Sequence, residues 1–148
     1  MVDIPDTLSK LIENFSKLPG IGKRTAERLA IYLIESDQIF IDDFSKNIDD
    51  INKKIKCCDN CHCFMEENIC SCQTIKSDTI CILRKASDVI MIQKTDYIGH
   101  YHILGNLISP IDGIGPEALN IDSLMKRIDN IKEIIIATDA SVDGDATA

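Results

Sequence analysis

Hydrophobic residues in the first third of the chain recur at the intervals of an α-helix. The spacing i, i+3, i+4, i+7 occurs twice, first at Leu8, Leu11, Ile12 and Phe15, then at Ala26, Leu29, Ala30 and Leu33. A third set follows over residues 42–56, at Phe44, Ile48, Ile51 and Ile55. Residues so spaced line one face of a helix. The pattern therefore predicts a helical N-terminal region over residues 1–56, with a connection near Ser36.

The second half of the chain alternates short apolar runs with a helical pattern. Residues 80–83, 101–104 and 134–137 read as strands, the last apolar on both faces, and residues 119–131 read as a helix. The run 89–92 suits either a strand or a short helix, because Ser87 and Asp88 before it form a plausible N-cap. Strands that alternate with helices indicate a parallel sheet.

The connection between the first two helices carries candidate binding chemistry. Pro19 stops the first helix, and Gly20 and Gly22 allow a tight turn with close backbone approach. The next helix then begins with exposed amides beside Lys23, Arg24 and Arg28. Free N–H groups and the helix dipole both favour an anion there. A helix-hairpin-helix that grips a nucleic-acid phosphate is one interpretation; an αα-corner with a solvated basic rim is the other.

Charge and composition narrow the kind of partner. The 148 residues carry a net charge of −8, yet residues 8–34 hold five basic and two acidic residues. Any DNA contact is thus a local, salt-sensitive patch. Aromatic residues make up only 5%, which argues against a base-stacking platform. No apolar run approaches a membrane span or a signal segment, so the chain is predicted to be cytoplasmic, without a membrane partner.

Six of the seven cysteines lie between positions 57 and 72, which suggests a metal site rather than disulfides. The spacing predicts a zinc knuckle over residues 57–79 with two chelating pairs, formed by Cys58, Cys61, Cys70 and Cys72. Four thiolates close a tetrahedral structural zinc site, one ion per chain. Cys57 or Cys63 could substitute as a ligand, His62 is a weaker candidate, and Cys81 reads as core.

Three acids follow the last apolar run: Asp139, Asp143 and Asp145. Acids after a buried strand suit a hard cation such as Mg²⁺. A further carboxylate would be needed from a neighbouring strand end, but that position holds Arg84, which could pair with an acid instead. The alternative is a solvated turn with acids at a helix start. The sequence predicts no catalytic residue.

These pieces, in this order, resemble the bacterial RecR family of recombination-repair proteins. The resemblance rests on residues 18–30, the cysteine knuckle, and residues 80–83, 87–89, 101–105, 107–116 and 137–148, above all Ser-Pro-Ile-Asp-Gly-Ile-Gly-Pro at 109–116. It implies a helix-hairpin-helix, a four-cysteine zinc finger and, over residues 80–148, a partial Toprim domain with a parallel sheet. It further implies a non-enzymatic, nucleoid-associated DNA clamp, a ring-shaped tetramer that acts with RecO and RecF to load RecA on gapped DNA.

Position by position, the resemblance makes Arg24 and Arg28 basic DNA contacts, with Lys23 where a proline is usual. Asp143 and Asp145 take the places of the family's Glu-x-Glu acids. Three departures stand out: the second cysteine pair is one residue short, Arg84 replaces a glutamate, and the sequence ends at Ala148, before the family's last strands. Two alternatives follow, a truncated product that cannot assemble a ring and a Mg²⁺-dependent Toprim nuclease or primase-like enzyme.

Overall fold

The computed structural model describes residues 4–148, so the first three residues of the predicted helical region lie outside the described residues. The chain divides into two compact units, one up to Ile51 and one from Asn52 onward. The first contains α1 (Asp6–Ser16), α2 (Lys23–Glu35) and most of α3 (Gln38–Lys54). All three helices were expected from the hydrophobic spacing. The third begins four residues earlier than predicted and ends before β1.

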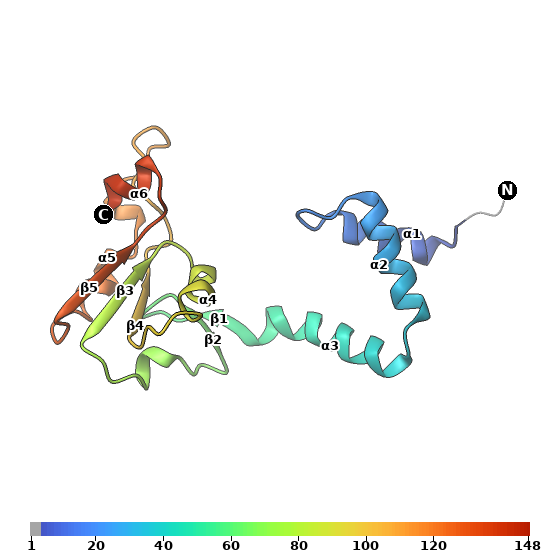
Figure 1. Cartoon of the computed structure of the whole chain (residues 1–148), viewed down its shortest axis with the longest axis horizontal. Coiled ribbons are helices and arrows are strands. Elements are labelled where there is room, and N and C mark those ends of the chain that lie inside the picture. Colours follow the sequence, from blue (N-terminus) through green and yellow to red (C-terminus); the bar gives the residue numbers. More distant parts are fainter. Residues whose placement is uncertain (1–3) are drawn as a thin grey trace. The chain divides into compact units, whose positions relative to one another are not determined.

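Helices α1 and α2 pack against each other and form the first unit's core (Figure 1). Ala26 and Ala30 of α2 are fully buried, whereas the apolar residues of α1 are half-buried. Two small side chains one turn apart let a neighbouring helix approach closely. The two helices are therefore held by a narrow apolar seam, and most of their remaining surface is free for contacts.

The second unit is built on a parallel sheet of β3 (Thr79–Leu83), β4 (His100–Ile103) and β5 (Glu133–Ala137), in the order β4-β3-β5. In the register, Cys81 of β3 lies opposite Tyr101 of β4 and Ile135 of β5. A small antiparallel hairpin, β1 (Ile55–Cys57) and β2 (Phe64–Glu66), frames the cysteine segment. Short helices α4 (Val89–Ile92), α5 (Ile121–Met125) and α6 (Val142–Thr147) complete it (Figure 1).

Alternate residues of β3 serve two separate cores. Cys81 and Leu83 point into a cluster that contains the buried cysteines of the knuckle, together with Tyr101 and Ile103. Ile80 and Ile82 of β3 belong to the cluster on the opposite face, together with Leu104, Leu119 and Leu124. Successive side chains of a strand point to opposite faces. The sheet is thus covered on one face by the cysteine knuckle and on the other by the α5 segment.

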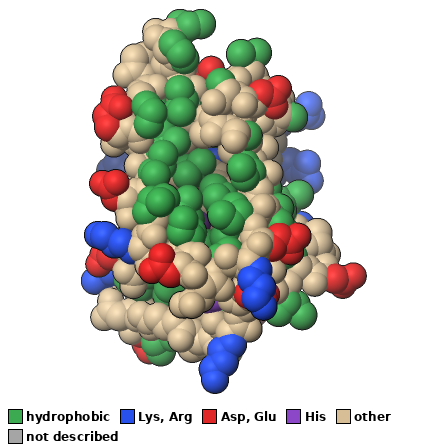
Figure 2. Space-filling view, turned by 90° about the vertical axis from the view of Figure 1, so that its left-hand side faces the viewer, with side chains coloured by type: hydrophobic (Ala, Val, Ile, Leu, Met, Phe, Trp, Pro, Cys, Tyr) green, Lys and Arg blue, Asp and Glu red, His purple; other side chains and the backbone are tan. Residues whose placement is uncertain are grey.

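Two predictions about these elements were wrong in part. The helix expected over residues 119–131 is confined to α5, because the chain turns back after Met125 and the Arg127 guanidinium bonds the Tyr101 carbonyl at 2.9 Å. The strand at 134–137 exists but is not buried. Its three isoleucines, Ile134, Ile135 and Ile136, remain 47%, 37% and 48% exposed because, among the described residues, β3 is the only element that packs closely against β5. On the side where β5 lies, Figure 2 shows hydrophobic side chains gathered on the surface.

Candidate nucleic-acid and metal sites

The turn between α1 and α2 has the backbone geometry that the sequence predicts. Gly20 lies in the left-handed region at φ +79°, which side chains other than glycine rarely adopt. Ile21 donates its N–H to the Leu18 carbonyl at 3.1 Å, which closes the turn. Gly22 is the N-cap of α2, and it provides no side chain to bond the first amides. These amides are therefore available to an external acceptor.

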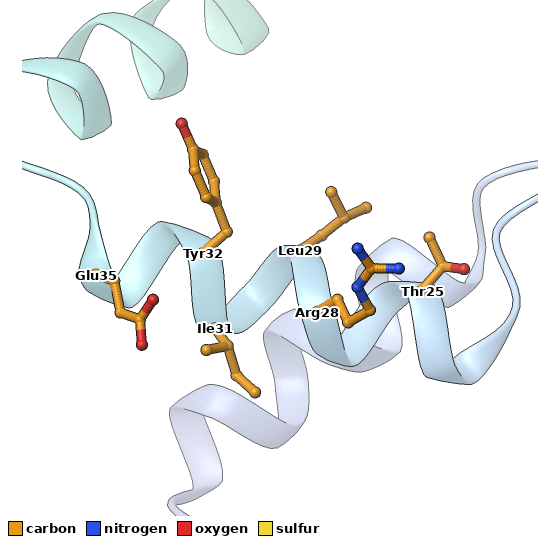
Figure 3. A pocket seen from close by; sticks show the side chains of 6 residues that line it. All are labelled: Thr25, Arg28, Leu29, Ile31, Tyr32 and Glu35. Carbon is orange, nitrogen blue, oxygen red and sulfur yellow. The ribbon is translucent and has the colours of Figure 1, made fainter.

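The basic residues of the turn are all exposed. Lys23 and Arg24 open α2, and Arg28 follows one turn later on the same helix. Figure 3 shows Arg28 beside Thr25 along a shallow pocket of about 450 Å³, whose far end carries Glu35. The positive end of the α2 dipole and the basic side chains of the turn therefore lie in the same region. The pocket itself is mixed in charge, and its apolar walls come from Leu29, Ile31 and Tyr32.

The structure brings together the four cysteines that the sequence singles out. The sulfur atoms of Cys58, Cys61, Cys70 and Cys72 all lie within 4.8 Å of one another. The Sγ atoms of Cys58 and Cys72 are 3.7 Å apart, and those of Cys61 and Cys70 are 3.3 Å apart. In a tetrahedron of thiolates at about 2.3 Å from zinc, the sulfurs are about 3.8 Å apart. The four thiols therefore fit a tetrahedral metal ion, although only one residue separates Cys70 from Cys72.

Local hydrogen bonds hold the two cysteine pairs in place. His62 donates its N–H to the Cys58 carbonyl at 2.8 Å, and the Cys58 N–H bonds the Cys63 carbonyl at 2.9 Å. The second pair lies on a short 3₁₀ turn, where the Gln73 N–H bonds the Cys70 carbonyl at 3.0 Å. Cys63 is buried beside the cluster but outside the set of four. Cys57 is exposed, and Cys81 lies in the core as expected.

The protonation of these thiols matters for metal binding. A hydrogen bond with the Cys63 thiol lowers the pKa of Cys61 to about 4, and the same bond raises the pKa of Cys63. Burial raises the pKa of Cys70 and of Cys72. Cys61 is therefore ready to bind a cation, whereas Cys70 and Cys72 must release protons as the ion enters. Metal binding at this site must weaken as the pH falls.

The acidic C-terminal turn does not form a comparable cluster. Among the residues that the structure describes, the four cysteines are the only group of three or more potential ligands close enough to share an ion. Arg84, at the end of β3, pairs with Asp139 at 2.5 Å. Asp143 and Asp145 lie in the first turn of α6, where Ser141 caps the Gly144 amide at 3.1 Å. The guanidinium thus lies beside the carboxylate that a cation would need.

A polar cluster beside the knuckle was missed by sequence reasoning. His62 and Ser123 hydrogen-bond each other at 2.8 Å, and the fully buried His102 contacts Arg127 at 3.1 Å. The available signal was a histidine inside the apolar strand pattern 101–104, because a polar side chain there requires buried partners. The partners could not be predicted, since they come from the segment wrongly expected to continue as a helix.

Comparison with known proteins agrees with this arrangement. The family model described as RecR, helix-hairpin-helix matches residues 8–51, and the Toprim domain model matches residues 78–148. Recombination protein RecR of Limosilactobacillus reuteri (strain DSM 20016) is 40% identical over 155 aligned residues, which cover 100% of this chain and 78% of that protein. The chain belongs to the RecR family.

A second RecR relative supports this assignment. The recombination protein RecR of Lactococcus lactis subsp. cremoris (strain MG1363) is 40% identical over 150 residues, 97% of this chain and 76% of that protein. The two matched models cover the helical unit and the parallel sheet, as the resemblance in sequence implied. Across residues 4–148, no helix is both long and apolar enough to cross a membrane.

Proposed function

We propose that this RecR-family protein binds DNA through the turn between α1 and α2, without reading base sequence, as a non-enzymatic factor of recombinational repair. The supporting observation is the uncapped start of α2 at Gly22, flanked by the exposed side chains of Lys23, Arg24 and Arg28. The amides and the helix dipole offer a site for one phosphate. Basic side chains add the salt-dependent attraction to its neighbours.

The test compares two charge reversals in the same unit. Arg24→Glu removes a cation beside the start of α2, so affinity for a gapped duplex at 100 mM salt should fall about tenfold or more, and the salt dependence should become shallower. Lys10→Glu is the control, because Lys10 lies on α1 and already pairs with Asp6. Fluorescence anisotropy measures both. Equal losses for the two variants would show that overall charge, rather than the turn, governs binding.

We assign structural zinc to the four-cysteine site, one ion per chain. Four sulfur ligands leave no position for water, so the ion would stabilise the fold rather than act on a substrate. The knuckle contributes its cysteines to the core beneath β3 and β4. In the proposed division, residues 1–56 bind DNA, residues 57–79 hold zinc, and residues 80–148 form the Toprim part.

We also assign a homo-oligomer, with α3 as the contact between copies. An apolar stripe runs along α3 through Phe40, Phe44, Ile48 and Ile51, all 37–55% exposed. An antiparallel second copy that opposes Phe44 to Ile51 would centre the contact between Asn47 and Ile48. A second copy presents the same apolar stripe, so the apolar pattern selects it as the occupant.

The remaining parts of the proposal rest on family membership. We propose that such an assembly acts with RecO- and RecF-type proteins as a clamp that helps to load RecA, within the nucleoid. A Mg²⁺-dependent Toprim enzyme is the less favoured alternative, since the guanidinium of Arg84 pairs with Asp139. Nuclease assays with Mg²⁺ address it directly, because cleavage abolished by Asp139→Asn would contradict the non-enzymatic role.

A further inference from the structure

The polar cluster between the knuckle and the α5 segment joins parts of the chain far apart in sequence. It contains one residue from the first cysteine pair's loop, one from β4 and three from the α5 segment: His62, His102, Asn120, Ser123 and Arg127. The rings of His62 and His102 meet edge to face, with centroids 5.6 Å apart. The cluster has no part in DNA or metal binding as proposed above.

The hydrogen bonds of this cluster determine which of its nitrogen and oxygen atoms carry the protons. The Asn120 carbonyl accepts from His102 Nε2 at 2.8 Å and from Ser123 Oγ at 2.9 Å. His102 therefore carries its proton on Nε2 and accepts from Arg127 at Nδ1. Because Ser123 donates to Asn120, its oxygen accepts from His62 Nε2. Every bond thus has one donor and one acceptor, with the His102 ring neutral.

Asn120 ties this cluster to β4. Its side-chain amide donates to the Ile103 carbonyl at 3.0 Å, and its own N–H bonds the Leu104 carbonyl at 3.0 Å. Ile103 in turn donates its N–H to the carbonyl of the ligand Cys61 at 2.9 Å. The loop of the first cysteine pair is therefore held twice, through the Cys61 carbonyl and through the His62 ring.

The backbone of His62 adds an independent observation. It lies in the left-handed region at φ +60°, a conformation that costs a non-glycine residue free energy. Glycine would take this position without that cost. The hydrogen bond to Ser123 and the contact with His102 are ring contacts that offset this cost.

We propose that the His62–Ser123 bond fastens the cysteine knuckle to the α5 segment, so that the knuckle releases its metal ion more slowly while this bond is formed. The inference rests on the zinc assignment made above. His62 is thus a positioning residue that holds the loop between Cys61 and Cys63 rather than a metal ligand. Opening the loop to release the ion requires the His62 ring to leave Ser123 and His102.

The experiment measures the rate at which the zinc-loaded full chain transfers its ion to the chromogenic chelator 4-(2-pyridylazo)resorcinol. Ser123→Ala should accelerate release about fivefold, the effect of one hydrogen bond. Ser123→Thr keeps the hydroxyl and should restore the parent rate. His62→Ala keeps a Cβ, and with it the backbone cost, but removes the ring, so it should accelerate release at least as much as Ser123→Ala. The double variant should be no faster than the faster single one, because both remove the same bond. Asp122→Ala, exposed on α5 beside Ser123, is the control.

Each outcome either supports or contradicts the fastening role of the His62–Ser123 bond. Unchanged release in Ser123→Ala, additive effects in the double variant, or equal acceleration by Asp122→Ala would overturn the fastening role while leaving the zinc assignment intact. A parent chain that holds no zinc would overturn both. Because Ser123→Ala removes only a hydroxyl, circular dichroism of the loaded chain should show the parent fold, and loss of that fold would also contradict a local role.

Discussion

At the scale of single residues, His102 is the clearest case of a side chain whose environment determines its chemistry. It lies on β4 with no exposed surface, and burial lowers its pKa from 6.5 to about 4. The Arg127 guanidinium beside Nδ1 acts in the same direction. A neutral imidazole is therefore part of the folded state at neutral pH, and protonation must oppose folding.

The lowered pKa of His102 makes the stability of the fold depend on pH in a direction that can be measured. Below pH 6.5 the unfolded chain binds a proton at His102 that the folded chain refuses until about pH 4, so stability falls as the pH decreases through that window. The expected loss between pH 7 and pH 5 is about 2 kcal/mol. The double variant His102→Phe/Arg127→Met should lose about 2 kcal/mol less of its unfolding free energy than the parent over this pH range. Urea unfolding at saturating zinc measures both proteins. Identical losses in variant and parent would show that other groups cause the acid sensitivity.

At the scale of elements, hydrophobic spacing predicted what depends on local pattern. The helices α1 and α2, the three parallel strands and the four gathered cysteines all follow from spacing within short segments. The predicted burial of β5 was wrong because exposure depends on which neighbours cover a strand. The sequence of residues 134–136 is equally compatible with a covered and an uncovered strand. The α5 error has a similar cause, since the bond between Arg127 and Tyr101 ends the segment through a contact that no local pattern encodes.

The difference between a central and an edge strand can be tested with matched substitutions. Ile80 of β3 and Ile134 of β5 lie opposite each other in the register, but Ile80 is fully buried and Ile134 is 47% exposed. Ile80→Thr should cost about 2–4 kcal/mol of unfolding free energy, whereas Ile134→Thr should cost less than about 1 kcal/mol. Ile134→Thr should also reduce aggregation in light scattering, because it weakens an apolar edge. Equal costs would mean that β5 is covered in solution.

At the scale of the whole molecule, the apolar stripe of α3 needs an explanation that one copy of the chain does not supply. Phe44 and Ile48 are 37% and 54% exposed on a helix of 17 residues, and within the described part of its own unit neither α1 nor α2 packs closely along it. Isolated exposed apolar residues are ordinary, but a stripe over several helical turns marks an interface. The antiparallel alignment proposed above has a specific consequence, because each substitution enters the contact twice.

Native mass spectrometry and sedimentation of the zinc-loaded chain should therefore show a dimer or a higher even assembly with one zinc per chain. Phe44→Ala should weaken association at least about tenfold, since a central aromatic side chain is lost from both copies. Lys46→Ala, on the opposite face of α3, is the control and should leave it unchanged. Association of Phe44→Ala as tight as that of the parent would exclude α3 as the contact between copies, because a stripe that forms the contact cannot lose its central aromatic side chain from both copies without effect.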